Sequence, residues 1–218
     1  YYESRSYTEY SAWYDDNVVY PFGYGLSYTS FSWDDMTVTE SGADEDGYRD
    51  VCYEISLTVT NTGDAAGKDI VELYYTAPYT EGGSEKSYVE LADFAKTDLL
   101  APGESQTVTL TVYKQDMASF DYNDANANGH TGYELDGGSY ELKLQTDSHN
   151  VKTDSNGEAL MAVVDLEAVN FDKDRVTHET VEARFSSVDG YNSLGGITSS
   201  EENGAAGDMT QLSRSDWE

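Results

Sequence analysis

Apolar and polar residues alternate with a period of two from about residue 31 to residue 169, and helical periodicity is nearly absent. Successive side chains of a β-strand point to opposite faces, so this alternation predicts half-buried strands in antiparallel sheets. In the clearest segment, residues 51–60, Cys52 would share the polar face with Glu54 and Ser56. Its apolar face would consist of Val51, Tyr53, Ile55, Leu57 and Val59. The pattern therefore predicts an all-β fold.

Further strands are expected at residues 31–40, 68–78, 105–114, 139–146 and 159–169, with a less regular one within 85–100. Residues 68–78 are apolar on both faces, as in a central strand. The last three expected strands have apolar faces made of Val108, Leu110 and Val112; of Tyr140, Leu142 and Leu144; and of Leu160, Ala162, Val164, Leu166 and Ala168. The segments NTGD (61–64) and APGE (101–104) contain turn-forming residues. About seven strands separated by turns predict a two-sheet sandwich of the immunoglobulin or fibronectin type III kind.

The composition changes after residue 170, where Gly, Ser and acidic residues replace the alternating pattern. We therefore expect the sandwich to occupy residues 31–170, and residues 171–218 to be a linker or extended segment. Residues 178–185 (HETVEARF) could add one further strand. The predicted fold is thus a sandwich with extended N- and C-terminal segments.

The chain contains 42 acidic and 12 basic residues, which gives a formal net charge of -30 at pH 7. This charge repels nucleic-acid phosphates and anionic lipid surfaces, so neither nucleic acid nor membrane is an expected partner. No run of residues approaches the roughly 18 apolar residues of a membrane span. The sequence also begins without methionine and is expected to be a piece of a longer protein.

The residue types that usually build metal or nucleophile sites are sparse. Cys52 is the only cysteine, which excludes an internal disulfide framework and a cysteine-rich zinc site, and no histidine lies near it in sequence to activate the thiol. His130, His149 and His178 are far apart in polar segments, so we expect them to be ordinary exposed residues. Adjacent carboxylates are expected by chance in so acidic a chain.

Residues 124–129 (DANANG) resemble the opening of a calcium-binding loop, with Asp124, Asn126 and Asn128 at alternate positions. The twelfth position of such a loop requires a glutamate, but here it is Leu135. We therefore expect an ordinary polar loop, with calcium binding as the alternative, and no metal or cofactor is predicted for the chain.

The segment YPFGYGLSYTSF (20–31) contains five aromatic residues and no charge. Gly23 and Gly25 permit a close approach to another chain segment. We predict that the segment packs against a neighbouring domain; the alternative is an ordinary approach to the first strand, buried in the core. The predicted interface residues are Pro21, Phe22, Tyr24, Leu26 and Tyr28.

Four motifs, in this order and spacing, resemble the fibronectin type III-like domain of glycoside hydrolase family 3 enzymes. They are YPFGYGLSYTSF (20–31), VTNTGDAAGKDIVELYY (59–75), ELADFAKTDLLAPGESQTVTL (90–110) and GYELDGGSYELKL (132–144). The resemblance covers about residues 18–150 and implies a part of an exo-acting β-glycosidase, similar to β-glucosidases of bacterial type or to β-xylosidases.

The resemblance implies a retaining enzyme with an aspartate nucleophile on a TIM barrel and an acid/base carboxylate on an α/β sandwich domain. The fibronectin type III-like domain of the family carries neither, so no catalytic residue is expected here. Residues 1–30 resemble the tail of the α/β sandwich domain and a junction, and residues 212–218 (LSRSDWE) resemble a connector to a barrel in enzymes of inverted domain order. Asp216 lies in an SDW sequence like that of the family nucleophile, but no apolar strand precedes it, so we expect coincidence.

The expected function is therefore a non-catalytic structural domain that braces the two catalytic domains, which are its expected partners. The alternative is a carbohydrate-binding module in which Trp13 or Trp33 stacks on sugar rings. A cell-surface adhesion domain would instead predict tandem copies, and the sequence contains one copy.

Overall fold

The computed structural model describes residues 17–42, 51–121 and 124–181. Within them, the chain forms strands β1 (Phe31–Ser41), β2 (Cys52–Asn61), β3 (Ile70–Thr76), β4 (Glu90–Lys96), β5 (Ser105–Tyr113), β6 (Ser119–Asp121), β7 (Gly132–Leu135), β8 (Gly138–Asp147), β9 (Asn150–Val151), β10 (Met161–Leu166) and β11 (Val169–Phe171), and one short 3-10 helix, η1 (Lys114–Met117). The prediction of an all-β fold is confirmed. No helix of the described part is long and apolar enough to cross a membrane.

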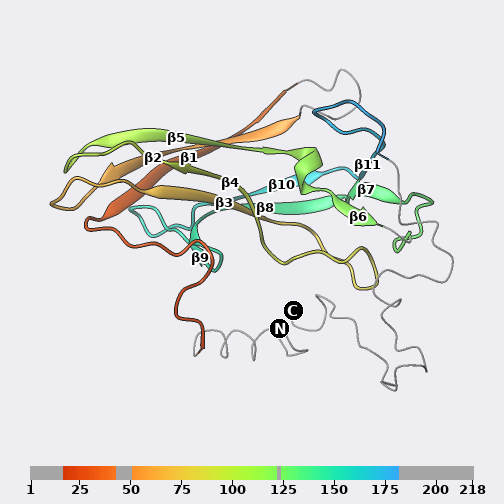
Figure 1. Cartoon of the computed structure of the whole chain (residues 1–218), viewed down its shortest axis with the longest axis horizontal. Coiled ribbons are helices and arrows are strands. Elements are labelled where there is room, and N and C mark those ends of the chain that lie inside the picture. Colours follow the sequence, from red (N-terminus) through yellow and green to blue (C-terminus); the bar gives the residue numbers. More distant parts are fainter. Residues whose placement is uncertain (1–16, 43–50, 122–123, 182–218) are drawn as a thin grey trace.

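Two antiparallel sheets form the body of the molecule. The first has the order β1-β2-β5, and the second has the order β10-β8-β3-β4 with the short β9 paired to β8. Figure 1 shows these sheets lying over one another, with β5, β2 and β1 in one layer and β3, β8 and β10 in the other. A third sheet, β11-β7-β6, lies at one end of the sandwich (Figure 1).

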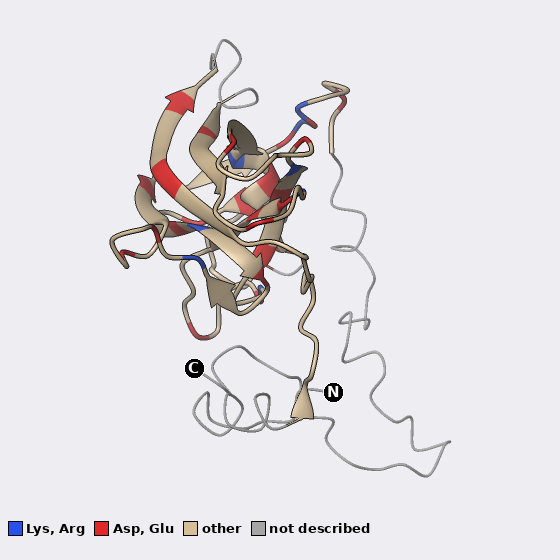
Figure 2. Ribbon diagram, turned by 90° about the vertical axis from the view of Figure 1, so that its left-hand side faces the viewer, with Lys and Arg blue, Asp and Glu red and all other residues tan. Residues whose placement is uncertain are grey.

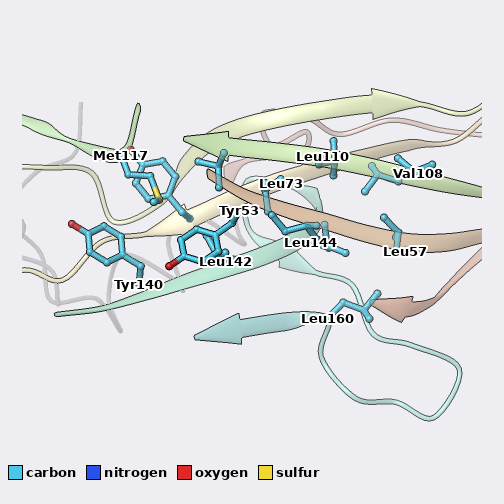
Figure 3. Packing of buried hydrophobic residues seen from close by; sticks show 14 of the residues in the cluster. Tyr53, Leu57, Leu73, Val108, Leu110, Met117, Tyr140, Leu142, Leu144 and Leu160 are labelled. Carbon is cyan, nitrogen blue, oxygen red and sulfur yellow. The ribbon is translucent and has the colours of Figure 1, made fainter. Parts of the chain in front are cut away.

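The core lies between the two larger sheets, because the apolar faces predicted from the alternation point inward. Ile55, Leu57 and Val59 of β2 are almost completely buried, whereas Glu54 is exposed. β3 lies between β8 and β4 and is buried on both faces, as predicted for residues 68–78. Figure 3 shows side chains of β2 and β5 facing those of β3 and β8 across the core.

Trp33 belongs to this core and is 1% exposed. Its Nε1 donates a hydrogen bond of 2.6 Å to Oδ2 of Asp69, and the Nζ of Lys152 lies 5.6 Å from the centre of its ring. Burial raises the pKa of the Asp69 carboxyl. The alternative in which Trp33 stacks on a sugar is therefore wrong, since its ring is enclosed by protein.

Asn61, predicted only as the first residue of a turn, links three chain segments from a fully buried position. Its Nδ2 donates hydrogen bonds of 2.8 Å to the carbonyl oxygens of Ala65 and Leu100. Its Oδ1 accepts hydrogen bonds from the backbone N–H of Gly63 and from the hydroxyl of Thr29, at 3.1 and 2.7 Å. One amide side chain thus joins the turn after β2 to the segments that precede β1 and β5.

Two details of the strand prediction need correction. The single strand expected at residues 159–169 is two strands, since β10 pairs with β8 and β11 pairs with β7 of the third sheet. The third sheet itself was not predicted, because β6, β7 and β11 are too short to produce a clear alternation.

Residues 172–181 form a small hairpin that is fixed to η1. The Arg175 side chain donates hydrogen bonds of 2.9 and 2.7 Å to the two carboxylate oxygens of Asp116, and its guanidinium lies 3.8 Å from the centre of the Tyr113 ring. Within the further strand expected at 178–185, residues 178–181 contain one isolated bridge, between Thr180 and Lys173. Residues 182–185 lie outside the described residues.

Candidate functional site

The predicted interface residues lie in a segment whose large apolar side chains are exposed. We call residues 19–28 the aromatic arm. Phe22 is 67% exposed, Leu26 is 86% exposed and Tyr28 is fully exposed. In Figure 2 the arm leads away from the sandwich and contains no acidic or basic residue. Acidic positions recur on the sandwich itself. The alternative of burial in the sandwich core is therefore wrong for the arm, and only Phe31, at the start of β1, packs against the core.

The backbone of the arm is ordered by a turn at residues 21–24. The N–H of Tyr24 donates a hydrogen bond of 3.1 Å to the carbonyl oxygen of Pro21. Gly23 occupies the third position of this turn with a φ of 86°, a conformation that side chains with a Cβ rarely adopt. The centres of the Tyr20 and Tyr24 rings lie 5.1 Å apart on the same segment. The turn therefore presents several aromatic side chains from one short stretch.

The arm contacts the sandwich through its backbone. The carbonyl oxygen of Phe22 accepts a hydrogen bond of 2.8 Å from the N–H of Ser148, in the connection between β8 and β9. The sequence predicted a close chain approach at Gly23, but it did not identify Ser148 or Glu72 as the residues approached. No local pattern could have identified them, since they lie far along the chain.

The loop with the partial calcium motif is held by hydrogen bonds to a buried carboxylate. The Nδ2 atoms of Asn126 and Asn128 donate to the two oxygens of Glu134, at 2.6 and 2.7 Å. The carboxylate of Asp124 accepts the backbone N–H of Gly129. The three side chains singled out in the sequence thus close the loop, and the Asn126 and Asn128 side chains present nitrogen, not oxygen, to the neighbouring carboxylate.

Glu134 is 2% exposed and also accepts a hydrogen bond of 3.3 Å from the hydroxyl of Ser84. Burial raises the pKa of its carboxyl, and the negative charge of Asp121 raises it further. The folded state therefore favours the protonated form of Glu134 more than solvent does.

We expect the chain to be more stable at pH 5 than at pH 8. Burial raises the pKa of Asp69, Glu72 and Glu134 above the usual values, so their folded state favours the protonated carboxyl. The associated stability is present at low pH and is lost as pH rises through the folded-state pKa values. Differential scanning calorimetry should show a lower Tm at pH 8 than at pH 5.

A measurement in high salt separates the effect of the buried carboxyls on Tm from the effect of repulsion among surface charges in a chain with a net charge of -30. In 1 M NaCl part of the fall in Tm should persist, because buried groups are screened less than surface groups. Asp34, Asp154 and Asp174 have lowered pKa values and titrate below this pH range, so they do not oppose the trend. An equal or higher Tm at pH 8 would contradict the prediction.

A shallow groove of about 460 Å³ lies between the edge strands β1 and β10. The register of β1 with β2 is irregular between Asp34 and Thr37, and Asp35 there has a φ of 57°. The residues that line the groove are Asp35, Met36, Val38, Asp154, Ala159, Leu160, Met161 and Ala162. No aromatic side chain lines it, so it offers no ring on which a sugar could stack.

The remaining candidates from the sequence are dispersed. Cys52, expected on the polar face of its strand, is buried and forms no disulfide, whereas His149 and His178 are exposed. His130 is partly buried, contrary to expectation, and its Nε2 is enclosed without a hydrogen-bond partner. Within the described residues, no three His, Cys, Asp or Glu side chains are arranged to hold a metal ion. Trp13 and Asp216 lie outside the described residues.

Comparisons with known proteins agree with the motifs. Residues 69–148 match the model of the fibronectin type III-like domain. The chain is 48% identical over 113 residues to β-glucosidase A of Butyrivibrio fibrisolvens, a match that covers 49% of this chain and 13% of that protein.

Solved structures show the same relationship. The crystal structure of a β-glucosidase from Paenibacillus barengoltzii is 39% identical with a TM-score of 0.56, and the match covers 69% of this chain and 16% of that one. That of the GH3 β-glucosidase from Bifidobacterium adolescentis is 27% identical with a TM-score of 0.56, and covers 74% and 20% of the two chains. The chain therefore spans a small fraction of the proteins it matches. It contains a fibronectin type III-like domain of the kind found in glycoside hydrolase family 3 β-glucosidases.

Proposed function

We propose that this chain is a non-catalytic structural part of a retaining β-glycosidase of β-glucosidase or β-xylosidase type, and that the aromatic arm packs against a neighbouring domain of that enzyme. The observation that carries the proposal is the exposure of the large apolar side chains of one uncharged segment. They are Val19, Tyr20, Phe22, Tyr24, Leu26 and Tyr28. Contiguous exposed apolar side chains are typical of protein interfaces.

The charge of the chain supports an intramolecular partner of limited negative charge. Acidic residues recur over the sandwich, so an acidic partner approaching it must overcome repulsion, whereas the arm offers contact without charge. We propose the α/β sandwich domain, which residues 1–30 would join to the β-sandwich of residues 31–170, as the partner of the arm. Residues 171–218 would lead to a TIM barrel.

The proposed role is to keep the catalytic carboxylates of two other domains at their working separation. A retaining glycosidase requires two carboxyl groups about 5 Å apart, and displacements of about 1 Å can be costly to the rate. A domain that contacts both neighbours limits such displacements. Catalysis itself would reside outside this chain.

The substitution Phe22→Ala in the whole enzyme tests this proposal. If the exposed ring is buried against a neighbouring domain, its loss should destabilise the interface by about 2 kcal/mol and lower activity. Phe94→Ala is the matched control, because Phe94 of β4 is 65% exposed, nearly as much as Phe22, but lies outside the arm. Thermal unfolding and kcat of the two variants should differ clearly. Equal effects would show that the arm has no special partner.

A further inference from the structure

The aromatic arm is attached to the sandwich at a specific place on the outer face of the five-stranded sheet. The turn at residues 21–24 lies against Glu72 of β3 and against Ser148 in the β8–β9 connection. We infer that these residues form a seat for the arm, which fixes its backbone and leaves its aromatic side chains directed away for a partner.

Gly23 fits the seat because it has no side chain. A Cβ at this position would lie 2.3 Å from Oε2 and 2.8 Å from Oε1 of Glu72. Glu72 is only 8% exposed, and its Oε2 accepts a hydrogen bond of 2.8 Å from the hydroxyl of Tyr74. The carboxylate therefore has little room to move away. Gly25, two residues further along the arm, has no atom within 4 Å of the corresponding position.

The second half of the seat is a turn organised by Asp147, which is 4% exposed. Its Oδ1 accepts hydrogen bonds from the backbone N–H groups of His149 and Asn150, at 2.9 and 3.1 Å. Its carbonyl oxygen accepts a hydrogen bond of 2.7 Å from Nε2 of Gln145. With the turn held in this way, the N–H of Ser148 points at the carbonyl oxygen of Phe22.

The seat uses the backbone of the arm, so the side chains of Phe22, Leu26 and Tyr28 remain exposed. An apolar segment attached through its own aromatic rings would have none left for a partner. We assign Gly23, Glu72 and Asp147 as positioning residues of the interaction surface. Only the identity of the partner rests on the proposed function; the attachment of the arm does not.

Amide hydrogen exchange of Ser148, followed by NMR in the whole 218-residue chain, tests the seat. Gly23→Ala should accelerate exchange at Ser148 about tenfold or more, because the arm must leave the seat. Gly25→Ala is the matched control and should change the exchange rate of the Ser148 amide less than about twofold. Chymotrypsin cleavage after Phe22, mapped by mass spectrometry, should increase in parallel.

A second pair of variants separates the contact with Glu72 from the strain of a positive φ. In a Glu72→Ala background, Gly23→Ala should accelerate exchange much less than in the natural chain, because the clash with the carboxylate is gone. The same acceleration in both backgrounds would overturn the seat, as would unchanged exchange in Gly23→Ala. Amides of β2 serve as the folding control, since their protection should not change in any of these variants.

The outcome is independent of the proposed function. Phe22→Ala alters only an exposed side chain and should leave exchange at Ser148 unchanged in this chain. If Gly23→Ala releases the arm but Phe22→Ala has no effect on the whole enzyme, the seat holds and the proposed partner is wrong. If Phe22→Ala acts in the enzyme but Ser148 exchange does not respond to Gly23→Ala, the seat is wrong.

Discussion

Replacing Asn61 with alanine is expected to lower the free energy of unfolding by about 3 kcal/mol. The substitution removes an amide that serves four hydrogen bonds from a fully buried position. The carbonyl oxygen of the buried Leu100 would lose this donor and keep only the N–H of Gly67, and Thr29 and Gly63 would lose their acceptor; unsatisfied polar groups in the interior are costly. Urea unfolding followed by circular dichroism measures the loss.

Asn156→Ala is the control for this substitution. Asn156 is exposed in a turn, and its side chain donates one hydrogen bond of 3.2 Å to Asp154. Its loss should change the free energy of unfolding by no more than about 0.5 kcal/mol. Comparable losses in the two variants would refute the assignment of Asn61 as a structural link between segments.

Trp33→Ala is expected to lower the free energy of unfolding by about 3–5 kcal/mol, because it leaves a large cavity between the sheets. Trp33→Phe separates the volume of the ring from its hydrogen bond. Trp33→Phe keeps an aromatic ring in the core but leaves Asp69 without the N–H of Trp33. We therefore expect it to lower the free energy of unfolding by about 2 kcal/mol. Thermal and urea unfolding of both variants provide the measurement.

Val163→Ala controls for the loss of an apolar side chain from a strand, since Val163 on β10 is 57% exposed. Val163→Ala should lower the free energy of unfolding by less than about 1 kcal/mol. A small effect of Trp33→Ala, similar to that of Val163→Ala, would be incompatible with the burial of the indole.

The two main sheets were predictable because their strands are long enough to show alternation. Ile55, Leu57 and Val59 could be assigned to the core from their spacing alone. The interior position of β3 was equally visible in its continuous apolar run. Alternation indicates a strand buried on one face, as in β2, and a continuous apolar run indicates a strand buried on both faces, as in β3. Both patterns can be read from the local sequence.

Other features depend on contacts between distant segments, which periodicity does not contain. Asn61 looked like a turn residue, since its partners Thr29 and Leu100 are far from it in sequence. Lys143 and Gln145 are buried although they alternate with leucines as polar face residues would. The break between β10 and β11 could not be distinguished from a continuous strand, because both segments are apolar at alternate positions.

The candidate site was predictable in the same partial way. An uncharged aromatic segment with two glycines indicated a surface for close packing, and Phe22, Leu26 and Tyr28 are exposed as such a surface requires. The residues that receive the arm come from β3 and from the end of β8, and no spacing in the sequence relates them to Gly23. Which of the two glycines needs its missing side chain was likewise visible only in three dimensions.

The hairpin fixed by Arg175 has a mechanical consequence. It contacts η1, at one end of β5, whereas the aromatic arm contacts the connection that follows the opposite end of the neighbouring layer's β8 (Figure 1). The two attachment points belong to different sheets, since η1 follows β5 of the first sheet and the β8–β9 connection belongs to the second. In the described residues no strand of one sheet pairs with a strand of the other, so a pull between the two points would be carried by the packed side chains of the core.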